Sequence, residues 1–165
     1  MTTVVDEHKE LRTDLFINVL RSAGEARLAV TGASMLPAIW PGDVLQIHRV
    51  EAADLSVGDI VVLRRDNRLT VHRLVELRRQ GDEVVLITRG DRSATDDPPF
   101  SAKHLLGNVQ VIRRGHRSVL PAKTSWRKMA SFVLRHSELL TTLVLYFYIN
   151  NFHPNSLAPE RVWAS

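Results

Sequence analysis

Residues 31–45 read TGASMLPAIWPGDVL and hold the most informative pattern in the chain. Ser34 precedes a methionine and stands three residues before Pro37, and the turn dipeptide Gly42-Asp43 follows. A single serine in such a setting is more often a surface or capping residue than a nucleophile. The segment is therefore interpreted together with the blocks that follow it.

From residue 26 to about residue 112, short apolar runs alternate with turn residues. Runs of this length, rich in Val, Ile and Leu and bounded by Gly, Pro, Asn and Asp, predict β-strands. Six strands joined by short turns favour a mainly β fold rather than βαβ units, either a curled antiparallel sheet or a partly open barrel. We expect these strands at residues 27–30, 44–48, 59–63, 69–77, 83–88 and 108–112.

Helical patterns flank this β-rich region. An amphipathic helix is expected over residues 9–22, where apolar side chains recur at helical spacing, at Leu11, Leu15, Val19 and Leu20. A basic linker is expected from residue 113 to 123, then a helix over about residues 125–149 and a loose tail. The expected organisation is an N-terminal helix (1–25), a β domain (26–114), and a basic linker, C-terminal apolar helix and tail (115–165).

Composition sets limits on function. With 165 residues, 44% of them hydrophobic and 24% charged, the chain is long enough for one ordinary globular domain. It has no cysteine, which excludes a disulfide framework, a thiolate nucleophile and a cysteine zinc site. Its histidines show no ligand spacing, so neither a metal nor another cofactor is expected. The net charge of +4 does not demand an anionic partner, and we expect no nucleic acid to bind.

Three blocks of the sequence together resemble one peptidase clan. The first is Ser34-Met35-Leu36-Pro37 with Gly42-Asp43, the second runs from VGDIVV (57–62) to TVHRL (70–74), and the third is TRGDRSATDD (88–97). In this order and spacing they resemble the serine peptidases that include signal peptidase I and the self-cleaving LexA-type repressors. The resemblance covers residues 26–114. It implies their fold, and a serine endopeptidase that cuts a leader or precursor peptide after small residues at positions −1 and −3.

The second block discriminates within this clan. Bacterial signal peptidases and LexA-type repressors carry a lysine as general base, whereas the archaeal and endoplasmic-reticulum signal peptidases carry a histidine in Val-His-Arg. His72 stands in such a sequence, and Asp97 ends a Gly-Asp block as in the histidine type. A serine hydroxyl needs a base to take its proton, and imidazole suits this task near neutral pH. We therefore expect Ser34 as nucleophile, His72 as general base and Asp97 as orienting acid.

Two features of the expected site remain open at this stage. Asp91 matches another acidic position of the family's third block and is expected to support the site, so either Asp91 or Asp97 could contact His72. The backbone N–H of Ser34 is one donor for a tetrahedral oxyanion. Gly32 stands where signal peptidases usually carry a serine and LexA-type repressors a glycine, so a second donor is not identified.

Two other functions compete with a signal-peptidase-like enzyme. A self-cleaving regulator of the LexA type would cut a small-residue pair such as Ala23-Gly24, although this pair lies only 11 residues before Ser34. The presence of His72 and Asp97 argues against that class. A non-catalytic binding module on the same fold would have no need of the serine, histidine and aspartate.

The expected partners are a peptide or preprotein substrate and a membrane surface. No secretory leader is expected at the polar N-terminus, and no run reaches the length of a spanning helix. The apolar run at residues 139–149 (LLTTLVLYFYI) follows several basic residues, so it could lie in a membrane interface, cap the sheet or pack on a partner. We expect membrane association, peripheral or through this run, with a cytoplasmic protein as the alternative.

Overall fold

The computed structural model describes residues 3–65, 68–81, 83–121, 142 and 146. These residues form one helix of regular length, two short 3-10 helices and eight strands. The helices are α1 (Thr3–Ala23), η1 (Ala52–Asp54) and η2 (Ala102–His104). The strands are β1 (Glu25–Ala29), β2 (Val44–His48), β3 (Ile60–Arg65), β4 (Arg68–Gln80), β5 (Glu83–Arg89), β6 (Phe100–Ser101), β7 (Leu105–Arg114) and β8 (Arg117–Val119).

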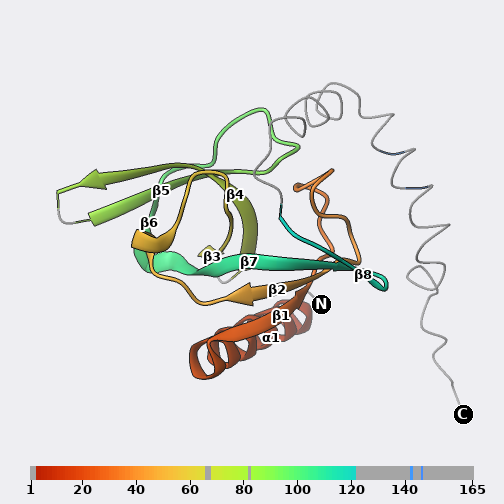
Figure 1. Ribbon diagram of the computed structural model, residues 1–165. Helices are drawn as coiled ribbons and strands as arrows, with labels where there is room; N and C mark the ends of the chain where they lie inside the picture. Colours follow the sequence, from red (N-terminus) through yellow and green to blue (C-terminus); the bar gives the residue numbers. More distant parts are fainter. Residues whose placement is uncertain (1–2, 66–67, 82, 122–141, 143–145, 147–165) are drawn as a thin grey trace, which may run out of the picture.

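All eight strands belong to one antiparallel sheet. Its order is β1-β2-β7-β3-β4-β5-β6, and β8 pairs with the outer part of β7 (Figure 1). The prediction of a mainly β, antiparallel fold is confirmed, and the sheet is open rather than a closed barrel. Residues 113–119, expected to begin a linker, instead finish β7 and turn through Gly115 into β8. The predicted C-terminal helix lies outside the described residues.

The central strand β3 is buried on both faces, and this divides the core in two. Ile60 and Val62 face one cluster, which α1 covers with Phe16, Ile17 and Leu20. Val61 and Leu63 face a second cluster with residues of β4 and β5. Alternate side chains of a strand point to opposite faces, so a strand with four buried residues in succession belongs in the middle of a sheet. This arrangement holds β4, which pairs with β3, in a defined position.

The predicted buried face of the N-terminal helix was wrong for three of four residues. Leu20 is buried as expected, but Leu11, Leu15 and Val19 are 67%, 61% and 43% exposed. Phe16 and Ile17 take their place against the sheet, with the buried Thr13 beside them. The helix has apolar residues on two faces, so helical spacing alone could not tell which of them packs on the sheet.

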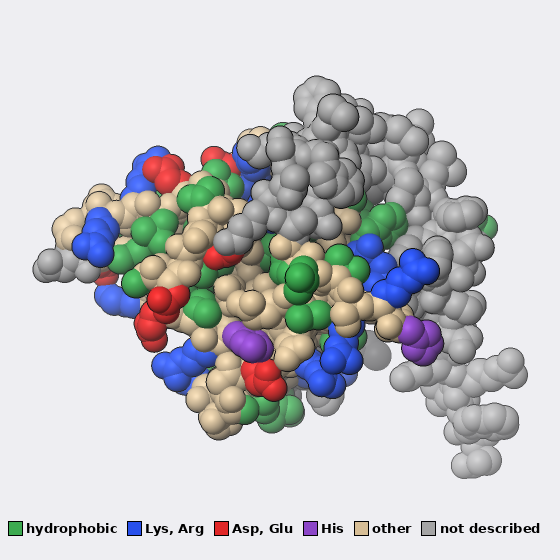
Figure 2. Space-filling model, in the orientation of Figure 1, with side chains coloured by type: hydrophobic (Ala, Val, Ile, Leu, Met, Phe, Trp, Pro, Cys, Tyr) green, Lys and Arg blue, Asp and Glu red, His purple; other side chains and the backbone are tan. Residues whose placement is uncertain are grey.

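Charged side chains of both signs are interspersed on the outer surface. Figure 2 shows basic and acidic groups mixed on the face viewed in Figure 1, without one continuous basic stripe. Several of these groups pair across elements, as Lys103 does with Glu83 at 2.6 Å. Within the ranges described here, no helix is long and apolar enough to cross a membrane.

Candidate active site

Ser34 is presented by a tight turn between β1 and β2. The turn covers residues 34–38 and is closed by a hydrogen bond of 3.0 Å from the Ile39 N–H to the Met35 carbonyl. Met35 and Leu36 are buried in the core, whereas Ser34 is exposed. The apolar side chains after the serine thus anchor the turn, and the hydroxyl of Ser34 is left at the surface.

A buried ion pair holds the rest of this loop. The carboxylate of Asp43 is completely buried and accepts hydrogen bonds from the Trp40 N–H at 2.8 Å and from Arg114 Nη2 at 2.7 Å. Arg114 also donates to the Ala38 carbonyl and lies 5.6 Å from the centre of the Trp40 ring. The loop that carries Ser34 is therefore bound to the end of β7.

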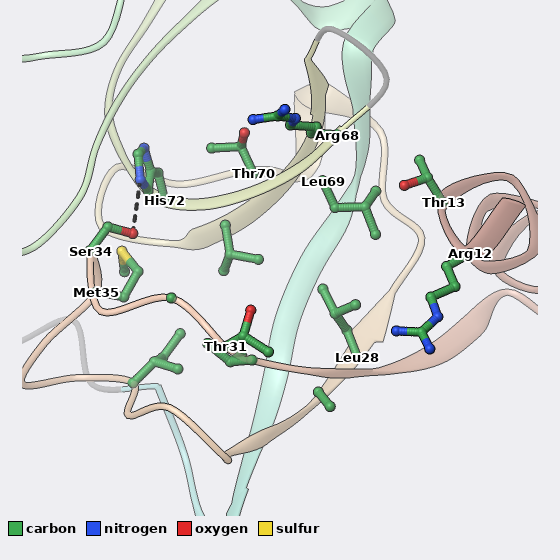
Figure 3. A pocket seen from close by; sticks show the side chains of 15 residues that line it. Arg12, Thr13, Leu28, Thr31, Ser34, Met35, Arg68, Leu69, Thr70 and His72 are labelled. Carbon is green, nitrogen blue, oxygen red and sulfur yellow. Dashed lines mark hydrogen bonds between the residues drawn. The ribbon is translucent and has the colours of Figure 1, made fainter. Parts of the chain in front are cut away.

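His72 lies between Ser34 and Asp97. This histidine belongs to β4. Its Nε2 atom is 3.2 Å from the Ser34 Oγ, a contact drawn in Figure 3, and its Nδ1 atom is 2.5 Å from the Asp97 Oδ2. The side chains of His72 and Asp97 are only 16% and 18% exposed. An ionised carboxylate can only accept, so the neutral imidazole carries its proton on Nδ1 and turns the lone pair of Nε2 toward the serine.

Asp97 is held by a residue to which the sequence assigned no role. Thr88, completely buried on β5, donates its hydroxyl to the Asp97 Oδ2 at 2.7 Å, and its carbonyl accepts the Asp97 N–H at 2.8 Å. These two hydrogen bonds fix the position of the carboxylate that contacts His72. Thr88 is the first residue of the block at 88–97, and this position was the one sequence feature that could have indicated a role in the site.

Asp91 contacts Arg73 rather than His72. Its two carboxylate oxygens accept from Arg73 Nε and Nη2, each at 2.7 Å, and Arg73 Nη1 donates to the Gly58 carbonyl. Arg73 follows His72 on β4, and the Asp91 side chain is 8% exposed. The structure thus brings Ser34, His72 and Asp97 together and places Asp91 in a neighbouring ion pair.

The segment after β5 passes very close to Ser34. The Arg92 N–H donates to the Ser34 carbonyl at 2.9 Å. A Cβ atom added to Gly90 would lie 2.8 Å from that carbonyl oxygen and 3.2 Å from the His72 Nε2. Only a residue without a side chain fits here, because such approaches are shorter than van der Waals contact. Gly90 is therefore a second residue of this block that the site requires.

A cleft of about 630 Å³ opens beside Ser34 and His72. One wall is formed by residues 28–32, at the end of β1, and the other by residues 68–72, at the start of β4 (Figure 3). β1 pairs only with β2, and this half of β4 pairs only with β3, so in the described part of the chain both walls have an unpaired strand edge. Such edges can bind an extended peptide through its backbone.

Among the residues with described positions, no group of three or more His, Asp or Glu side chains could hold a metal ion. At Ser34, His72 and Asp97, a hydroxyl, an imidazole and a carboxylate are joined in one line, an arrangement that can pass a proton from the hydroxyl to the imidazole.

The chain matches one family model and several known proteins. The family model described as Peptidase S24-like matches residues 2–109. The signal peptidase complex catalytic subunit sec11 of Neurospora crassa is 36% identical over 125 residues, which are 68% of this chain and 73% of that protein.

Two other relatives are matched over a smaller share of their length. The corresponding subunit of Yarrowia lipolytica is 33% identical over 86 residues, 51% of this chain and 49% of that protein. The LexA repressor of Pectobacterium carotovorum is 34% identical over 92 residues, 55% of this chain and 43% of that protein. The chain thus spans about half the length of these two relatives. Because the family model covers more than half of the chain, the protein belongs to the Peptidase S24-like family.

Proposed function

We propose that this protein is a serine endopeptidase of the signal-peptidase type in which Ser34 is the nucleophile, His72 the general base and Asp97 the acid that orients it. The observation that carries the proposal is the line of contacts from Ser34 Oγ through the two ring nitrogens of His72 to Asp97. Histidine in place of lysine agrees with the endoplasmic-reticulum signal peptidases that the sequence resembles, and two catalytic subunits of signal peptidase complexes are among the relatives.

The proposed reaction has two stages, and in each of them the same imidazole takes up a proton and gives it back. Ser34 Oγ attacks the substrate carbonyl carbon while His72 Nε2 takes the hydroxyl proton, and the Asp97 carboxylate stabilises the resulting imidazolium. The imidazolium then gives this proton to the leaving amine as the peptide bond breaks, which leaves an ester on Ser34. A water molecule, deprotonated by the same nitrogen, then attacks the ester carbonyl carbon. The bond to Ser34 Oγ breaks, the imidazolium returns its proton to this oxygen, and the serine is restored as the acid product leaves.

The backbone N–H of Ser34 is the proposed donor to the oxyanion. Among the described residues this N–H makes no hydrogen bond, so it is available for a developing charge. Gly32 and Thr31 line the same cleft, and the Thr31 hydroxyl is directed into it in Figure 3. No second donor is assigned.

The substrate is proposed to lie as an extended strand between the two unpaired edges of the cleft. Next to Ser34 the lining is apolar, with Met35, Ile39 and Val71, which suits uncharged side chains. The preference for small residues at −1 and −3 is what the resemblance implies. Asp91 is proposed as a positioning residue, because its pair with Arg73 attaches the segment of residues 90–97 to β4.

The domain division at residues 25 and 114 and the membrane role of residues 139–149 stay predictions. The apolar run and its basic flank lie outside the described residues, apart from isolated positions. We propose membrane association through this run, peripheral or inserted, with a cytoplasmic protein as the alternative.

Self-cleavage is the second candidate function, because a LexA repressor is among the relatives. The Ala23-Gly24 bond lies at the end of α1, where the Gly24 N–H donates to the Leu20 carbonyl and the Gly24 carbonyl accepts the Arg49 N–H at 2.8 Å. This bond would have to leave the helix end to enter a cleft as a strand. The folded arrangement therefore favours cleavage of another chain.

The test is cleavage of a leader-type peptide with alanine at −1 and −3, followed by mass spectrometry in the presence of lipid. We expect the wild type to cut after the −1 residue and Ser34→Ala to be inactive. Ser118→Ala, which changes an exposed serine on β8 away from the cleft, should keep full activity. Shortening of the protein itself near Ala23, with the peptide intact, would favour the self-cleaving function. Equal cleavage by wild type and Ser34→Ala would refute the proposed nucleophile.

A further inference from the structure

Two arginines line the end of the cleft that lies away from Ser34. Arg12 projects from α1, and Arg68 is the first residue of β4 (Figure 3). Both side chains are exposed, and neither has an acidic partner among the described residues. Their neighbour Arg64 differs, because it pairs with Asp14 at 3.2 Å.

The described lining of the cleft contains no aspartate or glutamate. Its charged groups are the two arginines, and its other residues are apolar, glycine, serine or threonine apart from His72. As far as the described lining goes, a peptide in the cleft therefore meets positive charge at one end, and no negative charge among these residues balances it. Such a site favours a carboxylate and disfavours a lysine at the matching position of the substrate.

The distance between the scissile bond and Arg68 follows from β4, which carries both His72 and Arg68. Arg68, Thr70 and His72 alternate along β4, so their side chains lie on one face of the strand. Four residues of an extended strand span about 13 Å. An extended substrate beside β4 advances at the same rate, so its side chain about four residues from the scissile bond comes near Arg68. Arg12 faces the same end of the cleft from α1.

We propose that the enzyme selects substrates with an acidic side chain four to six residues before the scissile bond, and that Arg12 and Arg68 are the specificity residues that bind it. The proposal rests on the proposed function, which puts the −1 and −3 side chains in the apolar part of this cleft. The arginines are exposed, so each one contributes a modest preference that salt weakens.

Binding tests this inference without cleavage. Three fluorescent peptides would share alanine at −1 and −3 and differ only in carrying Glu, Gln or Lys at −5. Fluorescence anisotropy with Ser34→Ala protein gives their affinities at low and high ionic strength. We expect the Glu peptide to bind about two- to fivefold tighter than the Gln peptide for each arginine engaged, and the Lys peptide to bind weakest. The same series moved to −4 and −6 locates the position.

Variants then assign the preference to the two side chains. Arg12→Gln and Arg68→Gln should each reduce the preference for Glu, and the double variant R12E/R68E should reverse it in favour of Lys. Arg117→Gln, an exposed arginine on β8 away from the cleft, is the matched control and should change nothing. Equal binding of the three peptides, or a preference that survives in the double variant, would overturn the inference.

The proposed function and this inference can fail separately. Cleavage of all three peptides at equal efficiency would leave the peptidase standing and remove the acidic preference. Charge-dependent binding that R12E/R68E reverses, with no cleavage by the wild type, would keep the specificity site and remove the peptidase.

Discussion

Arg114 and Asp43 form an ion pair across 71 residues of sequence, and it joins the loop that carries Ser34 to the end of β7. The carboxylate is completely buried, whereas the arginine side chain is 30% exposed. The pair therefore places a charge in the interior that has hydrogen-bond partners on both Trp40 and Arg114.

Removal of this arginine should destabilise the protein. In Arg114→Ala the Asp43 carboxylate stays buried with one partner fewer, and we expect the free energy of unfolding to fall by about 2–4 kcal/mol. Arg113→Ala is the matched control, because it changes the exposed neighbour on the same strand and should cost less than about 0.5 kcal/mol. Urea denaturation of the two variants measures both values, and equal stability would contradict the role of the pair.

Gly90 should tolerate no side chain. The added methyl group of Gly90→Ala would lie 2.8 Å from the Ser34 carbonyl oxygen, which belongs to the backbone and cannot move freely. We expect a loss of about 1–3 kcal/mol in unfolding free energy. Gly32→Ala is the control, because a methyl group there meets no atom within 4 Å. Thermal and urea unfolding compare the two, and a fully stable Gly90→Ala would show that the close approach is wrong.

Thr88 should affect catalysis through Asp97. Thr88→Val keeps the shape of the side chain but removes the hydroxyl that donates to the carboxylate. A hydrogen bond to a charged group contributes about 1.5–3 kcal/mol, so kcat should fall roughly tenfold or more. Thr88→Ser restores the donor and should recover most of the activity. Peptide cleavage with both variants checks this, and equal activities would exclude a role for the hydroxyl.

The two aspartates should differ in what they control. Asp97→Asn removes the negative charge that stabilises the imidazolium and adds an NH2 group that can donate to His72 Nδ1 and impose the wrong tautomer, so kcat should fall by on the order of 10³-fold or more. Asp91→Asn weakens the pair with Arg73, so it should lower stability by about 1–2 kcal/mol with a smaller effect on kcat. Kinetics and urea denaturation separate the two effects. A larger loss of kcat in Asp91→Asn would reverse the assignment.

Ser34 and His72 should act as one unit. Because every step assigned to His72 also requires the Ser34 hydroxyl or its ester, the double variant of Ser34→Ala and His72→Ala should be no less active than either single variant. His116→Ala changes an exposed histidine in the turn between β7 and β8 and serves as the control. Rates of peptide cleavage give the comparison, and additive losses would indicate that the two residues act independently.

Much of this arrangement was predictable from local sequence. The six strands were expected close to β1–β5 and β7 from their apolar runs and turn residues. Ser34, His72 and Asp97 were selected because three blocks of the sequence resemble a peptidase clan. The interactions that support these three residues were harder to predict. Arg114 and Asp43, for example, are 71 residues apart, and no local sequence pattern indicates that they form an ion pair. The short strands β6 and β8 were missed, since two or three residues carry too little alternation to detect. The packing face of α1 depends on the sheet beside it, which helical spacing does not describe.

Among the described residues, the strand edges beside Ser34 are unpaired, and this has a consequence for when a substrate can be cleaved. If the substrate binds to these edges as an added strand, its backbone must be extended before its side chains can reach their binding sites. A bond inside a helix or a folded domain already uses its N–H and C=O groups and cannot offer them to these edges. A precursor would therefore be open to cleavage only while its target segment is extended, before folding or assembly hides that segment.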